Sequence, residues 1–371
     1  MTENTDRTFF ALLKAGLWEQ KVETQDFGNI DYAQILQYAT EQSVVGMIAA
    51  GIEHVVDVKV PQVWVLQFIG STLQLEQRNQ AMNSFVADLI QDMRQHGIYV
   101  LLVKGQGTAQ CYERPLWRTC GDVDLFLSEE NYGKAKEFLM PLGEITEPEE
   151  KAKRHFAIKV REWMVELHGT LHVGLSKRVD CVLDDVQIDT FNGGSVRSWA
   201  NGRVQIFQLS IENDVFYTFT HILQHFYKGG IGLRQICDWC RLMWKNKDKL
   251  NFAKLESLIR KAGLMTEWRT FYNLAYRYLG LPNLGEGFMA HDPRFDKKAD
   301  RVMAFVMEVG NFGHNRDTGY LEGSAYLKRK TISASRRIKD LLRHTSIFPV
   351  NSVKFFFGIM WNGVVSTVRG E

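Results

Sequence analysis

Two aspartates, Asp122 and Asp124, stand two positions apart in the segment GDVDLFL, residues 121–127. If this segment is a strand, both carboxylates leave the same face, while Val123 and Leu125 turn toward the core. Neighbouring carboxylates on a buried strand repel each other and are costly to desolvate. A divalent cation between them would relieve both effects, and oxygen ligands favour Mg²⁺ or Mn²⁺ over Zn²⁺. The alternative is that the two residues cap a helix or end an exposed strand.

A third carboxylate, Glu166, stands two positions before His168 in WMVELHG, residues 163–169. The same alternation places both side chains on one face of a second strand. We therefore expect Glu166 to complete one metal site with the aspartate pair, across two neighbouring strands. His155, on the preceding predicted strand, faces either phosphate or solvent. Gly121, directly before the aspartate pair, allows a sharp entry into the first strand.

A glycine-rich turn, Lys104-Gly105-Gln106-Gly107-Thr108, closes an earlier predicted strand. Glycines let the backbone approach a ligand, and successive N–H groups at a helix start bind phosphate oxygens. The turn is neither a P-loop, which ends in Gly-Lys-Ser/Thr, nor a dinucleotide fingerprint, which needs a third glycine. A phosphate cradle beside three carboxylates describes a nucleotidyl-transfer site, because metals there neutralise a triphosphate and activate the attacking hydroxyl. The third carboxylate can act as the general base.

These segments together resemble the uncharacterised bacterial nucleotidyltransferases of the DNA polymerase β-like superfamily. The pattern is Lys-Gly after a strand, then Y-x-x-P-x-x-R-x-x-G-D-x-D-L from Tyr112 to Leu125, then E-x-H on a later strand. The resemblance implies that Asp122 and Asp124 hold Mg²⁺ or Mn²⁺ and that Glu166 completes the triad. The resemblance also implies that Arg118 grips phosphate at two points. We expect nucleotide contacts from Lys104, Gly105, Gly107, Thr108, Arg118, Gly121 and His168. The usual Gly-Ser after the first strand is absent, and Thr108 is the nearest hydroxyl.

The elements around these motifs indicate an α+β fold, with a small mixed β-sheet nucleotidyltransferase core flanked by N-terminal and C-terminal helical regions. We divide the chain into a helical region at 1–96, the core at 97–211 and a second helical region at 212–371. Apolar runs predict a helix at 131–140 and strands at 98–105, 123–127, 155–160 and 163–169, the last two as a hairpin. We expect a polar, turn-rich stretch at 180–202 and a loop at 285–300.

Two pairs in the C-terminal region have helical spacing. His221 and His225 share one helix face, but Ile222 follows the first histidine, so the HExxH pattern of zinc proteases is absent. They are either half-buried histidines bonded to the backbone or to a nearby acid, or part of the substrate cleft. Arg234 and Asp238 are also four residues apart, which predicts an intrahelical ion pair. The alternative is that Arg234 faces the nucleotide.

Composition narrows the function classes. The 371 residues carry 45 Lys and Arg against 43 Asp and Glu, a net charge of +2 without the basic excess of a duplex-binding protein, so no specific nucleic-acid partner is expected. The five cysteines are irregularly spaced and form no disulfide framework, and Cys237-x-x-Cys240 is expected to be two buried thiols rather than a zinc site. No signal peptide and no apolar run of about 18 residues is visible, so the expected location is the cytoplasm.

The last part of the chain is basic and then apolar. The basic residues of 324–344 are expected to form a solvated helix face, with attraction of an anionic partner as the alternative. The apolar segment 355–368 is too short to span a membrane and is expected to pack on the protein body. The alternative for this segment is a peripheral membrane contact.

Our hypothesis is Mg²⁺-dependent transfer of a nucleoside monophosphate from an NTP to an unknown acceptor, with release of pyrophosphate. A small molecule, a sugar or a protein could be the acceptor. The alternative from another class is a non-catalytic nucleotide-binding or interaction module on the same fold, because fold does not determine function. Two further alternatives are a metal-dependent phosphohydrolase that uses the same carboxylates, and a membrane-surface protein.

Overall fold

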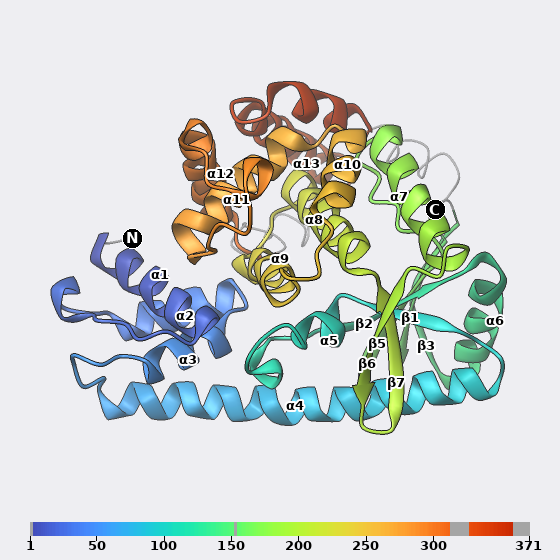
Figure 1. The fold of residues 1–371 in the computed structure, drawn as a ribbon, viewed down its shortest axis with the longest axis horizontal. Helices are drawn as coiled ribbons and strands as arrows, with labels where there is room; N and C mark the ends of the chain where they lie inside the picture. The colour runs from blue at the N-terminus through green and yellow to red at the C-terminus, as the bar shows by residue number, and fades with distance from the viewer. Residues whose placement is uncertain (1–2, 152–153, 312–325, 359–371) are drawn as a thin grey trace.

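The computed structural model describes residues 3–151, 154–311 and 326–358. The N-terminal part is helical, as predicted, with α1 Glu3–Trp18, α2 Tyr32–Glu41, α3 Val45–Glu53 and α4 Gln62–Gln95. The 34-residue helix α4 runs beneath both the other N-terminal helices and the sheet (Figure 1). Gly97 follows its end with φ +72°, the left-handed conformation that glycine adopts readily after a helix.

Five strands form one mixed sheet in the order β1-β2-β5-β4-β3. Their bounds are β1 Val100–Val103, β2 Asp122–Leu127, β3 Gly143–Glu150, β4 His155–Val160 and β5 Trp163–His168. β2 pairs antiparallel with β1 and parallel with β5, and the pairs β5–β4 and β4–β3 are antiparallel. This confirms the small mixed sheet and the predicted hairpin of β4 and β5.

The sheet has one apolar and one polar face. Val123 and Leu125 of β2 are buried in one cluster with Val165 of β5, the C-terminal half of α4 and helix α6, Glu129–Leu139. The alternation of side chains along β2 and β5 therefore turns Asp124 and Glu166 to the other face. Helix α8, Ile211–Lys228, lines a cavity together with Glu166 on that polar face.

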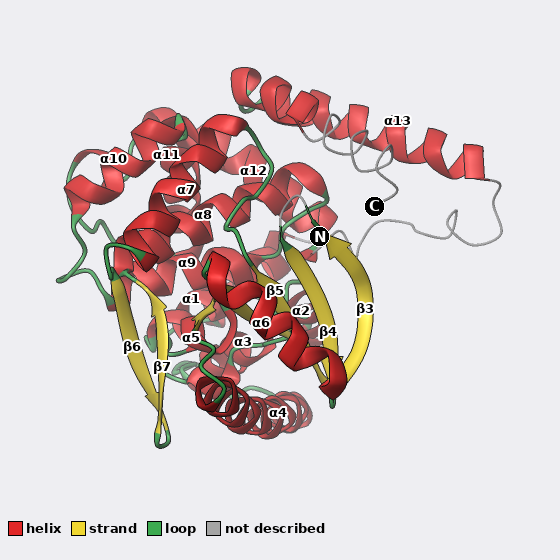
Figure 2. Cartoon of the chain, turned by 90° about the vertical axis from the view of Figure 1, so that its right-hand side faces the viewer, coloured by secondary structure: helices red, strands yellow, loops and turns green. Residues whose placement is uncertain are grey.

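The turn-rich expectation for 180–202 is wrong, because this stretch contains most of α7, Lys177–Phe191, and the strand β6, Val196–Asn201. α7 buries only a narrow stripe of its surface, so its sequence is largely polar. β6 pairs with β7, Val204–Leu209, as a separate hairpin that lies at one side of the molecule, with β3 at the other (Figure 2). β3 lacks an apolar pattern because it is an acidic strand at the sheet edge.

The C-terminal part is helical, as predicted. After α8 follow α9 Leu233–Lys245, α10 Phe252–Ala262, α11 Met265–Leu279, α12 Asp296–Val309 and α13 Tyr326–Thr345. The expected loop at 285–300 ends early, because α12 begins at Asp296. The short helices are α5 Gly105–Ala109 and the 3₁₀ turns Gln25–Phe27, Pro115–Trp117, Met140–Leu142, Gly287–Met289 and Pro293–Phe295. Among the described residues, no helix has the length and apolar character needed to cross a membrane.

The N-terminal and C-terminal helices share a hydrophobic core, which runs from Phe9 in α1 to Phe305 in α12. Hydrogen bonds also join them: Lys14 Nζ donates to the Arg277 carbonyl at 2.9 Å, and Trp18 Nε1 donates to the Leu279 carbonyl at 2.6 Å. The helical regions are therefore in direct contact, and the division at 96/97 and 211/212 stays a prediction.

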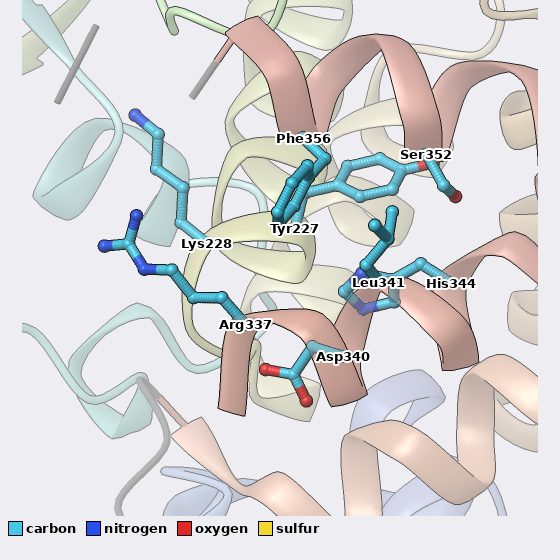
Figure 3. Close-up of a pocket in the computed structure, with 8 residues that line it drawn as sticks. All are labelled: Tyr227, Lys228, Arg337, Asp340, Leu341, His344, Ser352 and Phe356. Atoms are coloured by element: carbon cyan, nitrogen blue, oxygen red, sulfur yellow. The ribbon is translucent and has the colours of Figure 1, made fainter. Parts of the chain in front are cut away.

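The C-terminal end of the described chain packs on α8. Phe355 is buried against Tyr227 of α8, whereas Phe357 is exposed. Tyr227, His344 and Phe356 line a cavity of about 30 Å³ between α8, α13 and the helical residues 349–358 (Figure 3). The rest of the apolar segment, 359–368, and the side chains of the basic segment before residue 335 lie outside the described residues.

Candidate active site

The strand register brings the three predicted carboxylates together. β2 and β5 are parallel, and their pairing sets Asp124 directly beside Glu166, with Asp122 two residues earlier on the same face. One oxygen from each of the three carboxylates lies within 4.8 Å of the others. The site is therefore built by two strands that are neighbours in the sheet but separated in the chain by α6, β3 and β4.

The charges of this cluster are only partly compensated. Asp124 is 2 % exposed, and its Oδ1 accepts both Lys104 Nζ at 2.7 Å and His168 Nε2 at 2.8 Å. Burial alone would raise the pKa of Asp124, but Lys104 and His168 outweigh it and hold that pKa well below its usual range. The pKa of Asp122 is raised, first by the neighbouring Asp124 charge and then by burial. The cluster is thus a place where one more positive charge is stabilised.

The chemistry of the donor set fits a hard divalent cation. Three converging carboxylate oxygens match the oxygen ligands of Mg²⁺ and Mn²⁺. The convergence of the three carboxylates within 4.8 Å is the observation that carries this fit, because a bound cation would remove their mutual repulsion. Asp122, Asp124 and Glu166 are the residues that could hold the ion.

Lys104 links the glycine turn to the carboxylates. It lies between β1 and α5 with φ +56° and ψ −145°, a backbone conformation that residues other than glycine rarely adopt. The next residue, Gly105, has φ +45°. Gly105 and Thr108 line a cavity of about 60 Å³ together with Asp122 and Asp124. The turn therefore borders the site, as expected for a phosphate contact.

The other two glycines of the motif lie differently. Gly107 faces β7, where an added Cβ would be 2.1 Å from Gln208 Nε2, so its small size serves close packing. Gly121 has open space on its Cβ side, and its φ is not positive. The expected sharp entry into the strand at Gly121 is therefore wrong, because its backbone conformation does not require glycine.

Arg118 forms a buried ion pair with Asp238, an acidic residue outside the three-carboxylate cluster. It is 4 % exposed, and its Nε and Nη2 bond both oxygens of Asp238 on α9 at 3.0 and 2.6 Å. Tyr112 donates a further hydrogen bond to Asp238 at 2.7 Å. The prediction of an intrahelical ion pair between Arg234 and Asp238 is therefore wrong, because both carboxylate oxygens of Asp238 bond Arg118 instead. The two-point grip that the family resemblance implies for phosphate is used here within the protein.

Arg234 is a second arginine beside the carboxylates, and one of its donors is unused in the described part of the chain. Its Nη1 donates to the Thr119 carbonyl at 2.8 Å, and its Nε is buried without a hydrogen-bond partner among the described residues. Arg234 lines the same 60 Å³ cavity as Asp122 and Gly105. The sequence alternative in which Arg234 faces the nucleotide agrees with this position.

Helix α8 adds residues that the strand motifs do not reveal. Tyr217, His221 and Gln224 follow one face of α8 and line a cavity of about 190 Å³ with Lys104 and Glu166. Their spacing of four and three residues is the signal from which sequence reasoning could have found them. The two histidines are hydrogen-bonded to each other, with His225 Nε2 at 2.9 Å from His221 Nε2. Burial and then Lys104 lower the pKa of both, so both are neutral imidazoles at pH 7.

A mixed sheet that carries three converging carboxylates on one face, between helical flanks, is the arrangement of a nucleotidyltransferase fold. The chain belongs to a family described as uncharacterised nucleotidyltransferase, whose family model matches residues 28–280. That range contains the whole sheet, the glycine turn, α8 and α9. No curated protein and no solved structure matches the chain.

Proposed function

We propose that the protein transfers a nucleoside monophosphate from an NTP to a hydroxyl or phosphate of an acceptor, with Mg²⁺ or Mn²⁺ and with release of pyrophosphate. The observation that carries the proposal is the convergence of Asp122, Asp124 and Glu166 within 4.8 Å, beside Lys104. A small molecule, a sugar or a protein is the proposed acceptor class. We place the reaction in the cytoplasm, and all five cysteines are free thiols, as a reducing compartment favours.

Each residue has a defined part in this proposal. Asp122 and Asp124 hold the cation, which when bound neutralises the triphosphate and lowers the pKa of the attacking hydroxyl. Glu166 accepts the proton of the acceptor, because its carboxylate lies beside the aspartate pair where the attacking hydroxyl would bind. Burial would raise the pKa of Glu166, but the contact with His155 and the charge of Lys104 outweigh it. Arg234 supplies positive charge to the phosphates, while Arg118 positions the loop before β2 through Asp238.

Calorimetry with Mn²⁺ and each NTP, together with a pyrophosphate assay, tests this proposal. We expect Asp122→Asn and Asp124→Asn to weaken metal-dependent NTP binding at least about 100-fold, because they remove ligand charge. Asp185→Asn is the matched control, since Asp185 on α7 is 57 % exposed and only pairs with Lys261 at 3.7 Å. If the intact protein binds no NTP in the presence of metal, the proposal is wrong.

A non-catalytic nucleotide-binding module is the second candidate. Two observations favour it: the Arg118 guanidinium is occupied by Asp238, and the cavity beside the glycine turn measures only about 60 Å³. In that case, the protein binds an NTP with metal but releases neither pyrophosphate nor phosphate against any acceptor. Release of inorganic phosphate instead of pyrophosphate would indicate a phosphohydrolase.

A further inference from the structure

A second group of ligand atoms lies next to the three carboxylates. His155 stands at the start of β4, directly opposite His168 at the end of β5 in the antiparallel register. Glu166 precedes His168 by two residues and so shares its face. One ligand atom from each of His155, Glu166 and His168 lies within 4.8 Å of the others. Two imidazoles and one carboxylate therefore converge on the rim of the 190 Å³ cavity.

The separations of these atoms from the Glu166 oxygen are close to those of ligands around a common metal ion. His155 Nε2 lies 3.1 Å and His168 Nε2 lies 3.6 Å from the same oxygen, Oε2 of Glu166. Ligand atoms about 2.1 Å from a metal are separated by about 3.0 Å in an octahedron and about 3.4 Å in a tetrahedron. The 3.1 Å contact of His155 with Glu166 is also within hydrogen-bond distance, whereas the 3.6 Å separation of His168 and Glu166 exceeds it.

His168 links this group to the aspartate pair. Its Nε2 lies 2.8 Å from Oδ1 of the buried Asp124, whose carboxylate belongs to the three-carboxylate cluster. The cavity beside the group leaves room for water or a substrate oxygen, which is the open position of a catalytic rather than a structural metal site. His221 also lines this cavity, and burial lowers its pKa, so it adds no charge that would repel a cation.

We propose that His155, Glu166 and His168 form a binding site for a transition-metal ion of the zinc class, separate from the oxygen-only cation position and sharing Glu166 with it. Imidazole nitrogens suit Zn²⁺ and its neighbours in the first transition row, whereas Mg²⁺ requires oxygen ligands. The two positions therefore select different ions. The inference goes beyond nucleotidyl transfer, because it depends only on the donor atoms.

A cobalt titration tests the site. The full chain, freed of metal and without nucleotide, is titrated with Co²⁺ in an excess of Mg²⁺, and the visible absorption is recorded. We expect one equivalent of Co²⁺ with the intense visible absorption of a four-coordinate site, and its displacement by Zn²⁺. His155→Ala weakens Co²⁺ binding at least about 100-fold, because the loss of a ligand exceeds the 10- to 100-fold loss typical for its supporting partners.

Two control variants separate this site from its surroundings. His172→Ala removes an imidazole that lines the same cavity but pairs with Asp184 at 2.7 Å, and it leaves Co²⁺ affinity within about twofold. Asp122→Asn removes a ligand of the oxygen-only position, and it also leaves the Co²⁺ spectrum in place. Because no nucleotide is present, a failure of nucleotidyl transfer leaves this measurement unaffected.

Three results overturn the proposal. These are no Co²⁺ binding, equal binding by His155→Ala and the intact protein, and loss of the spectrum in Asp122→Asn alone. If His155→Ala does not fold, X-ray absorption of the zinc-loaded intact protein replaces it. Two imidazole ligands in that spectrum support the site, and fewer than two overturn it.

Discussion

Lys104 combines an unfavourable backbone with a favourable side-chain position. Its φ of +56° belongs to the region that favours glycine, and such a residue costs of the order of 1–3 kcal/mol. Its ammonium lies 2.7 Å from the buried Asp124 and faces the Tyr217 ring at 5.8 Å. Backbone strain persists where surrounding contacts hold it, and it concentrates at functional sites. The contacts of the Lys104 ammonium with Asp124 therefore hold this residue in its strained backbone conformation.

Two substitutions at Lys104 separate the strain from the charge. Both Lys104→Gly and Lys104→Ala remove the ammonium, but only glycine relaxes the backbone. We expect the glycine variant to be more stable than the alanine variant by about 1 kcal/mol, the reverse of the usual order. Urea unfolding measures the difference. An alanine variant of equal or greater stability contradicts the positive φ.

The histidine pair on α8 makes stability depend on pH. Burial, and then Lys104, lower the pKa of His225 to about 4 from an ordinary 6.5. Between those values the unfolded chain binds a proton that the folded protein does not, so stability falls as the pH drops from about 6.5 to about 4. Each such histidine contributes a slope of about 1.4 kcal/mol per pH unit.

We expect His225→Gln to flatten this dependence. Urea unfolding at pH 7 and at pH 5 compares the variant with the intact protein, and the loss of stability between the two pH values should be smaller in the variant. A parallel loss in both proteins would show that His225 is protonated in the folded state.

At the scale of elements, glycines set how closely α1 and α3 approach. A Cβ at Gly51 of α3 would lie 2.0 Å from the Leu12 carbonyl oxygen, and one at Gly16 of α1 would lie 1.8 Å from the Met47 carbonyl oxygen. Both neighbours are backbone atoms, which cannot rotate away. The two helices therefore pack backbone to backbone, and neither glycine is replaceable without moving a helix.

The same substitution at two helical glycines should have opposite effects. Gly51→Ala is expected to destabilise the protein by about 1–3 kcal/mol through overpacking. Gly70→Ala, at an exposed position inside α4 with nothing within 4 Å, is expected to stabilise it by up to about 1 kcal/mol through helix propensity. Thermal unfolding measures both. A stabilising effect at both positions contradicts the contact of α1 with α3.

At the scale of the whole molecule, one buried arginine joins three parts of the chain. Arg241 of α9 is 1 % exposed and donates to the Leu17 carbonyl at 3.0 Å, to the Cys111 carbonyl at 3.0 Å and to Glu113 at 2.8 Å. These acceptors belong to α1 and to the loop between α5 and β2. The N-terminal helices, the core and the C-terminal helices are thus expected to unfold together.

Arg241→Lys tests this coupling. A lysine cannot reach three separate acceptors with the geometry of a guanidinium, so we expect a loss of at least about 2 kcal/mol. Native-state hydrogen exchange should show equal loss of protection in α1 and α11. Arg260→Lys is the control, because Arg260 is 61 % exposed and pairs only along its own helix with Glu256. Loss of protection in α9 alone would mean that the regions unfold separately.

Strand periodicity alone predicts which side chains share the polar face of the sheet. The two-residue period of a strand places Asp122 with Asp124, and Glu166 with His168, whatever the rest of the chain does. Apolar runs likewise indicated β1, β2, β4 and β5, because buried strands need continuous or alternating apolar residues. These patterns lie within single segments, so they can be recognised without knowing which segments contact each other in the fold.

Which of these faces meet depends on how the strands pair, and this pairing is visible only in the folded chain. The β2–β5 register places Asp124 beside Glu166, and the β4–β5 register sets His155 opposite His168. The pairing of Arg118 with Asp238, 120 residues apart, replaced the local pair that helical spacing favoured. Contacts between residues distant in the chain depend on the burial of whole surfaces and on charge compensation in the interior. A periodic pattern in a single segment carries no information about either effect.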